Sequence, residues 1–314
     1  MSPRRPLLVL LAMTALAVAP AAPRAQTMST YATVPAPQGL AFDGAGNLYV
    51  TSGGPTHGLY KVPSGGGAGV LFANTGFVDV WGVACDVAGN VYVADRNATV
   101  ANGGRIWKVT PAGAISTLAS GLPGPFGLAI DAGGNLYTGA YNGQRILRIT
   151  PAGVVSTYAT GLGVVGNQTY QIEFDTDGNL YAGNEARILR IGPGGAPVTE
   201  VVGNLIQSMG FVRWTGDNFI VSTFGGGRLL FTQPAPRGTP AAPITSLTLV
   251  NQCTDGVMPA GARVNQPVFM ALHQDVVYFA DQACNKVRRF LLTNLDGPVP
   301  ALKRSWEQVK PRYR

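Results

Sequence analysis

One short motif recurs along most of this 314-residue chain and fixes the length of its repeating unit. A turn ending in Gly-Asn precedes a strand-like run with a tyrosine at positions 49, 92, 137 and 181, so these copies are 43, 45 and 44 residues apart. Two weaker copies lie around Ile220 and Tyr278. A second motif, typified by Ile146-Leu147-Arg148-Ile149, follows each copy, so both motifs occur six times. Such regular spacing indicates a fold built by stacking one structural unit.

The copy from Phe126 to Ala159 shows what one unit contains. Its alternating apolar runs, separated by turns rich in Gly, Asn and Pro, predict four antiparallel strands. A four-stranded sheet cannot bury both of its faces alone, so the copies have to stack. Six stacked sheets that close into a ring form an all-β, six-bladed β-propeller with four-stranded antiparallel blades.

The chain ends supply the closure of the predicted ring. The stretch Ser29–Thr33 nearly copies Ser156–Thr160, which lies at the outermost strand of a unit, although no unit precedes it. The last unit, from Pro267 to about Leu292, lacks a fourth strand. We therefore expect the N-terminal strand to complete the last blade and remove an exposed sheet edge.

The repeated pattern Pro-x-Gly-Leu-Ala-x-Asp, followed by Gly-Asn-Leu-Tyr-Val, resembles the NHL repeat over roughly residues 29–292. NHL-type propellers are similar to those of gluconolactonases and virginiamycin B lyase. The resemblance implies a propeller scaffold, and it implies lactone hydrolysis or a lyase reaction only where the site residues of those enzymes are present.

The two ends of the chain differ from the repeats in composition. Residues 1–25 resemble a secretory signal peptide, because Arg4 and Arg5 precede the apolar run Leu7–Val18. The propeller then spans residues 26–300, and residues 301–314 form a basic tail. The signal and the tail together account for the net charge of +7, which leaves the propeller near neutral. We therefore expect a periplasmic or secreted monomer with no membrane span and no nucleic-acid partner.

Two of the three cysteines have a predicted role. Cys253 follows the outer strand of blade 5, and Cys284 lies in the loop between the second and third strands of blade 6. Both loops project from the same face in adjacent blades, so we expect a disulfide between them. The segment Asn251–Gln266, which contains Cys253, is long enough to fold over the channel as a partial lid.

The mouth of the channel is the predicted binding site. Two sets of positions surround it: the residue before each first-strand glycine, and the residues that follow each second strand. The predicted ligand-binding residues at these positions are Gln38, Trp81, Asp95, Phe126, Tyr141, Tyr170, Glu185, Met209 and Asp281, and Arg96 and Phe224 also occupy such positions. Aromatic rings with a few polar groups suit a small organic ligand. The alternative is that these rings only fill the channel, and that Asp95 and Asp281 only bind loop amides.

The enzyme interpretation stays open at this point, with no residue assigned as catalytic or as a metal ligand. The Asn that gluconolactonases carry in a Pro-Asn-Gly motif is replaced by Gln38 and Phe126 in the equivalent tripeptides. The two histidines, His57 and His273, lie toward opposite faces of the propeller and cannot form the His pair of a lyase. We therefore predict a protein that binds a small organic ligand or a protein partner without a cofactor. A lactonase or lyase with a rearranged divalent-metal site, such as calcium held by Glu185, Asp95 or Asp281, is the alternative.

Overall fold

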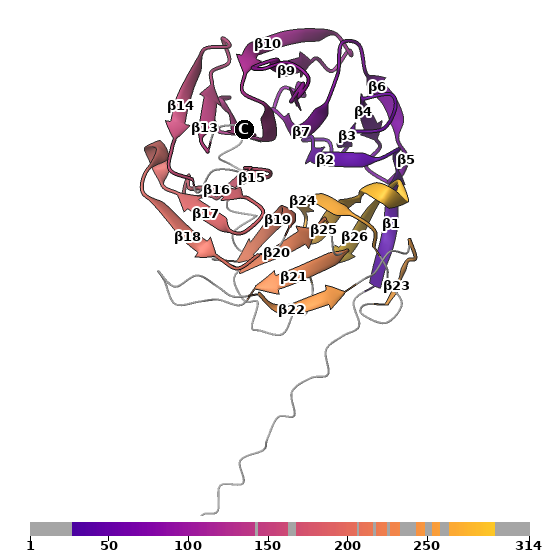
Figure 1. Cartoon of the computed structure of the whole chain (residues 1–314). Helices are drawn as coiled ribbons and strands as arrows, with labels where there is room; N and C mark the ends of the chain where they lie inside the picture. Colours follow the sequence, from indigo (N-terminus) through magenta and orange to yellow (C-terminus); the bar gives the residue numbers. More distant parts are fainter. Residues whose placement is uncertain are drawn as a thin grey trace, which may run out of the picture.

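The computed structural model shows a ring of six β-sheets around a central axis, which confirms the predicted six-bladed propeller (Figure 1). It describes residues 27–141, 144–162, 168–205, 207–215, 218–224, 227–232, 243–248, 253–257 and 264–292. The predicted signal peptide (1–25) and basic tail (301–314) lie outside these ranges. No helix within them is long and apolar enough to cross a membrane.

Each of the first five blades is a four-stranded antiparallel sheet in chain order. From the channel outwards, the strands of blades 1 to 3 are β2 (Pro37–Phe42), β3 (Leu48–Ser52), β4 (Gly58–Val62) and β6 (Val70–Ala73); β7 (Val80–Cys85), β8 (Val91–Asp95), β9 (Gly104–Val109) and β10 (Ile115–Leu122); and β11 (Pro125–Ile130), β12 (Leu136–Ala140), β13 (Ile146–Ile149) and β14 (Val155–Ala159). Those of blades 4 and 5 are β15 (Ile172–Phe174), β16 (Leu180–Gly183), β17 (Ile188–Ile191) and β18 (Val198–Val202); and β19 (Ser208–Thr215), β20 (Asn218–Thr223), β21 (Arg228–Thr232) and β22 (Pro243–Thr248).

Blade 6 joins the two ends of the propeller. Its first four strands from the centre outwards are β24 (Pro267–His273), β25 (Val276–Asp281), β26 (Lys286–Leu291) and β1 (Thr27–Thr33). β1 runs antiparallel to β26, with Ser29 opposite Arg289 and Thr33 opposite Lys286. Minor elements of the described residues include β5 (Gly67–Ala68), which pairs with β1, and the short 3-10 turns η1 (Pro193–Gly195) and η2 (Gln282–Cys284).

The predicted disulfide is confirmed, and it fastens an additional strand to this blade. Cys253 and Cys284 are bonded, with their Cα atoms 5.4 Å apart. β23 (Gly256–Val257) pairs with the outer edge of β1, where Thr27 faces Val257. Within the segment expected as a lid, β23 therefore adds to the outer edge of blade 6, whereas Asn265 and Gln266 accept backbone bonds from Ala283 and Gln282 in the loop after β25. Residues 251–252 and 258–263 of that segment lie outside the described ranges.

The turn chemistry of the repeat explains why the blades form. In blade 3, the Asp131 carboxylate accepts hydrogen bonds from the backbone N–H groups of Gly133 and Asn135, both at 2.9 Å. Gly134 follows with a φ of 76°, which an L side chain rarely adopts. The Asp43, Asp86 and Asp175 carboxylates make the same bonds in blades 1, 2 and 4. This turn holds the first two strands of a blade in register.

Glycines on the inner strands let the blades approach closely around the channel. A Cβ at Gly39, Gly82, Gly127 or Gly210 would overlap a backbone carbonyl oxygen of the next blade. Blades 4 and 6 carry Gln171 and Phe269 instead. The Gln171 amide donates to the carbonyl oxygens of Phe211 and Met270, at 2.6 and 2.8 Å, and so bridges β19 and β24. These two larger side chains occupy the space that the glycines leave open.

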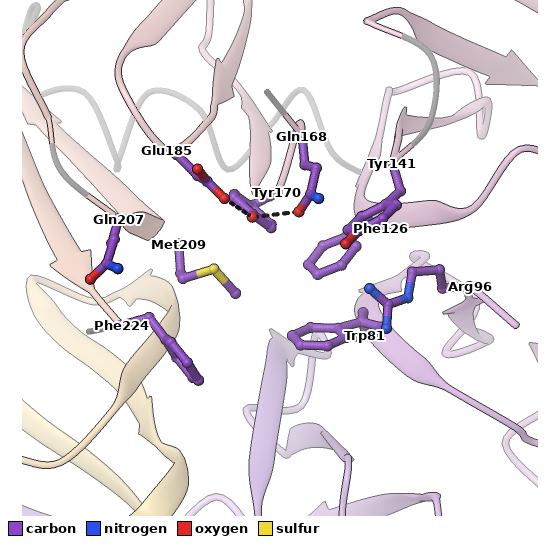
Figure 2. Close-up of a pocket in the computed structure, with 10 residues that line it drawn as sticks. All are labelled: Trp81, Arg96, Phe126, Tyr141, Gln168, Tyr170, Glu185, Gln207, Met209 and Phe224. Atoms are coloured by element: carbon purple, nitrogen blue, oxygen red, sulfur yellow. Dashed lines mark hydrogen bonds between the residues drawn. The ribbon is translucent and has the colours of Figure 1, made fainter. Parts of the chain in front are cut away.

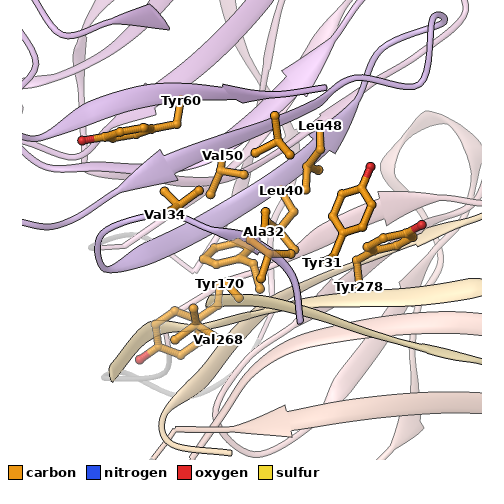
Figure 3. Packing of buried hydrophobic residues seen from close by; sticks show 14 of the residues in the cluster. Tyr31, Ala32, Val34, Leu40, Leu48, Val50, Tyr60, Tyr170, Val268 and Tyr278 are labelled. Carbon is orange, nitrogen blue, oxygen red and sulfur yellow. The ribbon is translucent and has the colours of Figure 1, made fainter. Parts of the chain in front are cut away.

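Buried apolar residues join blade 6, β1 and blade 1 across the closure (Figure 3). Tyr31 of β1 lies edge-on to Tyr278 of β25, with ring centroids 4.9 Å apart, and its hydroxyl donates to the Ser64 carbonyl at 2.9 Å. The same cluster extends to Phe126 and Tyr170 at the channel mouth. The closure and the mouth therefore share one core.

Candidate ligand-binding site

A cavity of about 260 Å³ lies at the channel mouth (Figure 2). The side chains that line it come from blades 2 to 5, and they are Trp81, Arg96, Phe126, Tyr141, Gln168, Tyr170, Glu185, Gln207, Met209 and Phe224. The repeat positions these residues, because each belongs to an inner strand, the segment just before one, or the loop after a second strand. Equivalent positions in neighbouring blades therefore converge on one opening.

Stacked aromatic rings form one wall of the cavity. Trp81 lies over Phe126 with centroids 4.2 Å apart, and Tyr141 is nearly parallel to Phe126 at 5.9 Å. Phe126 is only 1% exposed and also stacks on Phe269 at 5.9 Å, so it belongs to the packing that fills the channel. Trp81 and Tyr141 are partly exposed and offer ring surface to a ligand.

An arginine covers the edge of this wall. The Arg96 guanidinium carbon lies 4.6 Å from the ring centroid of Tyr141 and 5.3 Å from that of Trp81. Its Nε bonds to Asp79 at 2.6 Å, and the other oxygen of Asp79 accepts a bond from Trp81 Nε1 at 2.8 Å. Asp79 therefore orients both the cation and the indole ring.

A polar group faces this wall from blade 4. The Tyr170 hydroxyl lies 2.6 Å from Glu185 Oε1 and 2.5 Å from Gln168 Oε1. Burial, and then the adjacent Glu185 carboxylate, raise the pKa of Tyr170 far above its ordinary value, so the phenol keeps its proton. That single proton can serve only one acceptor at a time, which leaves the cluster with spare acceptor capacity.

The structure brings together six of the nine predicted ligand-binding residues: Trp81, Phe126, Tyr141, Tyr170, Glu185 and Met209. The other three do not line the cavity. Asp95 is buried and accepts bonds from the N–H groups of Val78 and Asp79 and from Trp107 Nε1. It therefore holds a loop, as the alternative interpretation anticipated.

Asp281 and Gln38 are buried as well. Asp281 accepts a bond from the Asn265 N–H at 2.7 Å and pairs with the buried Arg288 at 3.2 Å. Gln38 lies against Gly53, and its Oε1 has no hydrogen-bond partner within the described residues. Neither side chain is therefore placed to contact a molecule in this cavity.

Sequence reasoning missed three residues of the site. Gln168 and Gln207 lie two residues before the predicted mouth residues Tyr170 and Met209, so extending the repeat register by two residues would have found them. Asp79 lies two residues before Trp81, and only its hydrogen bonds reveal its role. The arginine that it orients does follow from the repeat, because Arg96 directly follows a second strand.

The residues around the mouth do not fit a divalent metal ion. Calcium prefers six to eight oxygen ligands, including several carboxylates. Of the three carboxylates considered for such a site, only Glu185 lines the cavity, because Asp95 and Asp281 are engaged elsewhere. No group of three or more His, Cys, Asp or Glu side chains is arranged for a metal anywhere in the described ranges.

Similarity to solved structures supports the fold. An auxiliary nutrient-binding protein from Bacteroides ovatus matches with a TM-score of 0.65 at 15% identity, over 84% of this chain and 76% of its own. Virginiamycin B lyase from Staphylococcus aureus, as an inactive variant with quinupristin, matches with a TM-score of 0.60 at 17% identity, over 85% and 99%. No protein-family model matches the sequence, and a search of curated proteins finds no match. At these identities the likeness concerns the propeller alone.

Proposed function

We propose that this six-bladed propeller binds a small cyclic organic molecule in the cavity at its channel mouth. The observation that carries the proposal is the partly exposed aromatic wall of Trp81 and Tyr141, which faces the polar Glu185 and Tyr170 across about 260 Å³. Ligand sites commonly combine apolar ring surface with a few placed polar groups. The nutrient-binding neighbour from Bacteroides ovatus is compatible with a binding role for this scaffold.

The energy of binding should come mainly from ring surface. Covering a large apolar side chain contributes about 1.5–3 kcal/mol, and a solvated carboxylate contact contributes less. Trp81→Ala should therefore weaken binding more than Glu185→Gln does. Phe126→Ala is the poorer test, because Phe126 is buried among the rings that fill the channel and its loss would lower stability.

The experiment is a screen of cyclic fragments against the whole protein by ligand-detected NMR, with Kd values measured for the hits. Trp81→Ala should weaken them roughly 10–100-fold, the range that corresponds to about 1.5–3 kcal/mol. Phe72→Ala is the matched control, because Phe72 is a partly buried ring beside Tyr49 on the outer part of blade 1. Each variant must keep the wild-type melting temperature. Fragments that bind equally well to Trp81→Ala would refute the site.

The small number of carboxylates at the mouth argues against a lactonase or lyase with a metal site. Glu185 is the single carboxylate among the lining residues, and it accepts a bond from Tyr170. Turnover of a lactone or a cyclic peptide ester that a chelator abolishes would overturn the binding proposal. A protein partner that competes with the fragment hits would reassign the mouth to protein recognition.

We also propose that the protein works in the periplasm or outside the cell. The Cys253–Cys284 disulfide supports this location, since such bonds persist in oxidising compartments. The signal-like pattern of residues 1–25 supports it as well. Fractionation of the expressing bacterium tests the location, and full-length protein retained in the cytoplasm with both thiols free would contradict it.

A further inference from the structure

The guanidinium of Arg96 is held in place by a carboxylate at one edge and by aromatic rings around it. Arg96 Nε bonds to Asp79 at 2.6 Å, and the backbone N–H of Arg96 donates to the Asp79 carbonyl at 2.9 Å. Three aromatic rings lie within 5.6 Å of its guanidinium carbon. The side chain is therefore fixed before any ligand arrives, and little conformational entropy is lost when it binds one.

The other edge of this guanidinium is free to bind a ligand. Within the described residues, Arg96 Nη1 and Nη2 form no hydrogen bond, although the side chain lines the cavity and is only 19% exposed. Two parallel N–H groups at the end of an arginine match the two oxygens of a carboxylate. The fixed orientation of Arg96 thus offers the cavity a preformed carboxylate site.

The side of the cavity opposite Arg96 carries a carboxylate, which complements the positive charge of the arginine. Figure 2 shows Glu185 on the far side of the opening from Arg96, with the Tyr170 hydroxyl pointing toward it. Glu185 Oε1 receives the Tyr170 hydroxyl, and Oε2 has no partner among the residues that the structure describes. A protonated amine or a hydroxyl is the group that such a carboxylate binds.

Two simpler ligand classes fit less well. A lone cation held by the aromatic faces would lie beside the Arg96 guanidinium, whose carbon is within 5.6 Å of the ring centroids of Trp81, Phe126 and Tyr141. A multiply charged anion such as inorganic phosphate would face Glu185, while Asp79 already compensates the charge of Arg96. Both alternatives place like charges together, which costs binding energy.

We propose that the ligand is a single-ring organic acid that carries a protonated amine or a hydroxyl at its other end, with the carboxylate on Arg96 and the donor on Glu185. The cavity of about 260 Å³ equals the volume of about nine water molecules at ~30 Å³ each, which suits one ring with two short substituents. This inference rests on the proposed function, since it assigns a chemical class to the same site.

Four matched probes test the assignment against the whole protein by calorimetric titration: 4-(aminomethyl)benzoate with both groups, 4-methylbenzoate with the acid alone, benzylamine with the amine alone, and 4-methylbenzamide with neither. The first should bind most tightly. Removing the carboxylate should weaken binding ~10–100-fold, and removing the amine ~3–10-fold, as expected for charge-assisted hydrogen bonds.

The variant Arg96→Gln should abolish the difference between 4-(aminomethyl)benzoate and benzylamine. The matched control is Arg105→Gln, because Arg105 stacks on Trp107 with its guanidinium carbon 5.5 Å from the ring, yet does not line the cavity. Arg105→Gln should preserve the difference. An additional variant, Glu185→Gln, should reduce the advantage of the amine while leaving that of the carboxylate.

The outcomes separate this inference from the proposed function. Equal affinity for the charged and the neutral probes, with no effect of Arg96→Gln but loss of binding in Trp81→Ala, would overturn the charge assignment and keep the binding site. Failure of all four probes, while other rings from the fragment screen still bind through Trp81, would overturn the ligand class. If no ring of any kind binds to the folded protein, both proposals fail.

Discussion

The buried ion pair behind the closing strand provides the sharpest test of how the ring is held together. Arg288 of β26 is fully buried and bonds to two carboxylates, Asp281 at 3.2 Å and Asp255 at 2.8 Å. Asp255 in turn accepts bonds from the backbone N–H and the hydroxyl of Thr30 on β1, at 2.9 and 3.1 Å. The guanidinium therefore connects blade 6, the segment that precedes β23, and the closing strand.

Replacing Arg288 with methionine should destabilise the protein strongly at neutral to alkaline pH. The substitution leaves the Asp281 carboxylate buried without its cation, and breaking a buried pair in this way costs about 3–5 kcal/mol. Asp281 keeps its bond from the Asn265 N–H, so part of its hydrogen bonding survives. The free energy of unfolding, measured by urea denaturation at about pH 8, should fall by that amount.

The pH dependence of this loss follows from the titration of Asp281. Burial raises the pKa of Asp281 to about 7, against the lowering effect of the bonds from Asn265 and Arg288. Its folded-state pKa lies above the unfolded value of 3.8, so the stabilising contribution of the protonated acid is present at low pH and is lost as the pH rises toward 7. Without Arg288 the pKa should rise further. The cost of Arg288→Met should therefore be smaller at about pH 5 than at about pH 8.

A double variant separates the charge effect from lost packing. Adding Asp281→Asn to Arg288→Met removes the unpaired charge but keeps an acceptor for Asn265, so most of the lost stability should return at about pH 8. A loss below about 1 kcal/mol for the single variant, or an equal loss at both pH values with no recovery in the double variant, would refute this account of the closure.

Two further predictions concern the disulfide and the seam between blades 6 and 1. Replacing Cys253 and Cys284 with serine opens a loop with a sequence separation of 31 residues and should reduce the free energy of unfolding by roughly 3–4 kcal/mol. The free energy of unfolding of the wild-type protein should fall by the same amount when a reductant is present. Denaturation midpoints that stay unchanged would refute the prediction. Burial lowers the pKa of His273, whose ring stacks on Phe42 at 4.2 Å, so its contribution is present above about pH 6.5 and lost as the pH falls through the lower folded value. The stability difference between wild type and His273→Gln should therefore shrink between about pH 7 and pH 5 in chemical denaturation, and a constant difference would contradict this.

The fold could be predicted from the sequence because each repeat contains the turn and strand signals of one blade. The turn at Asp131 and the alternation after it recur in other blades, so strands and blade count follow from local chemistry. The closing strand was recognisable because Ser29–Thr33 copies an outer strand that has no blade before it. Both signals lie in short stretches that one sequence displays completely.

The site was predictable only as far as the repeat extends. Register positions identified Trp81 and Glu185. The repeat also places the loops of Asp79 and Arg96 side by side, since their backbone bond recurs between equivalent residues of other blades, but the side-chain bond that orients Arg96 is specific to blade 2. Whether a carboxylate at such a position faces solvent depends on nearby amides, which is why Asp95 became a loop support. The sequence shows that Gln171 replaces the glycine found on other inner strands. Its hydrogen bonds to Phe211 and Met270, which belong to two other blades, can be seen only in the structure.

The position of β1 has a consequence for the order in which the molecule is made. Thr33, near the start of the chain, pairs with Lys286, so the contact order of this pairing is among the largest that the chain allows. During synthesis β1 emerges first, and its partner β26 emerges only after every other blade. Until then the nascent ring has two unpaired edges, one on β1 and one on the blade made last, and each is a template for intermolecular strand pairing. Closure of the ring therefore has to wait until β26 has been made, which places it late in the folding of the propeller.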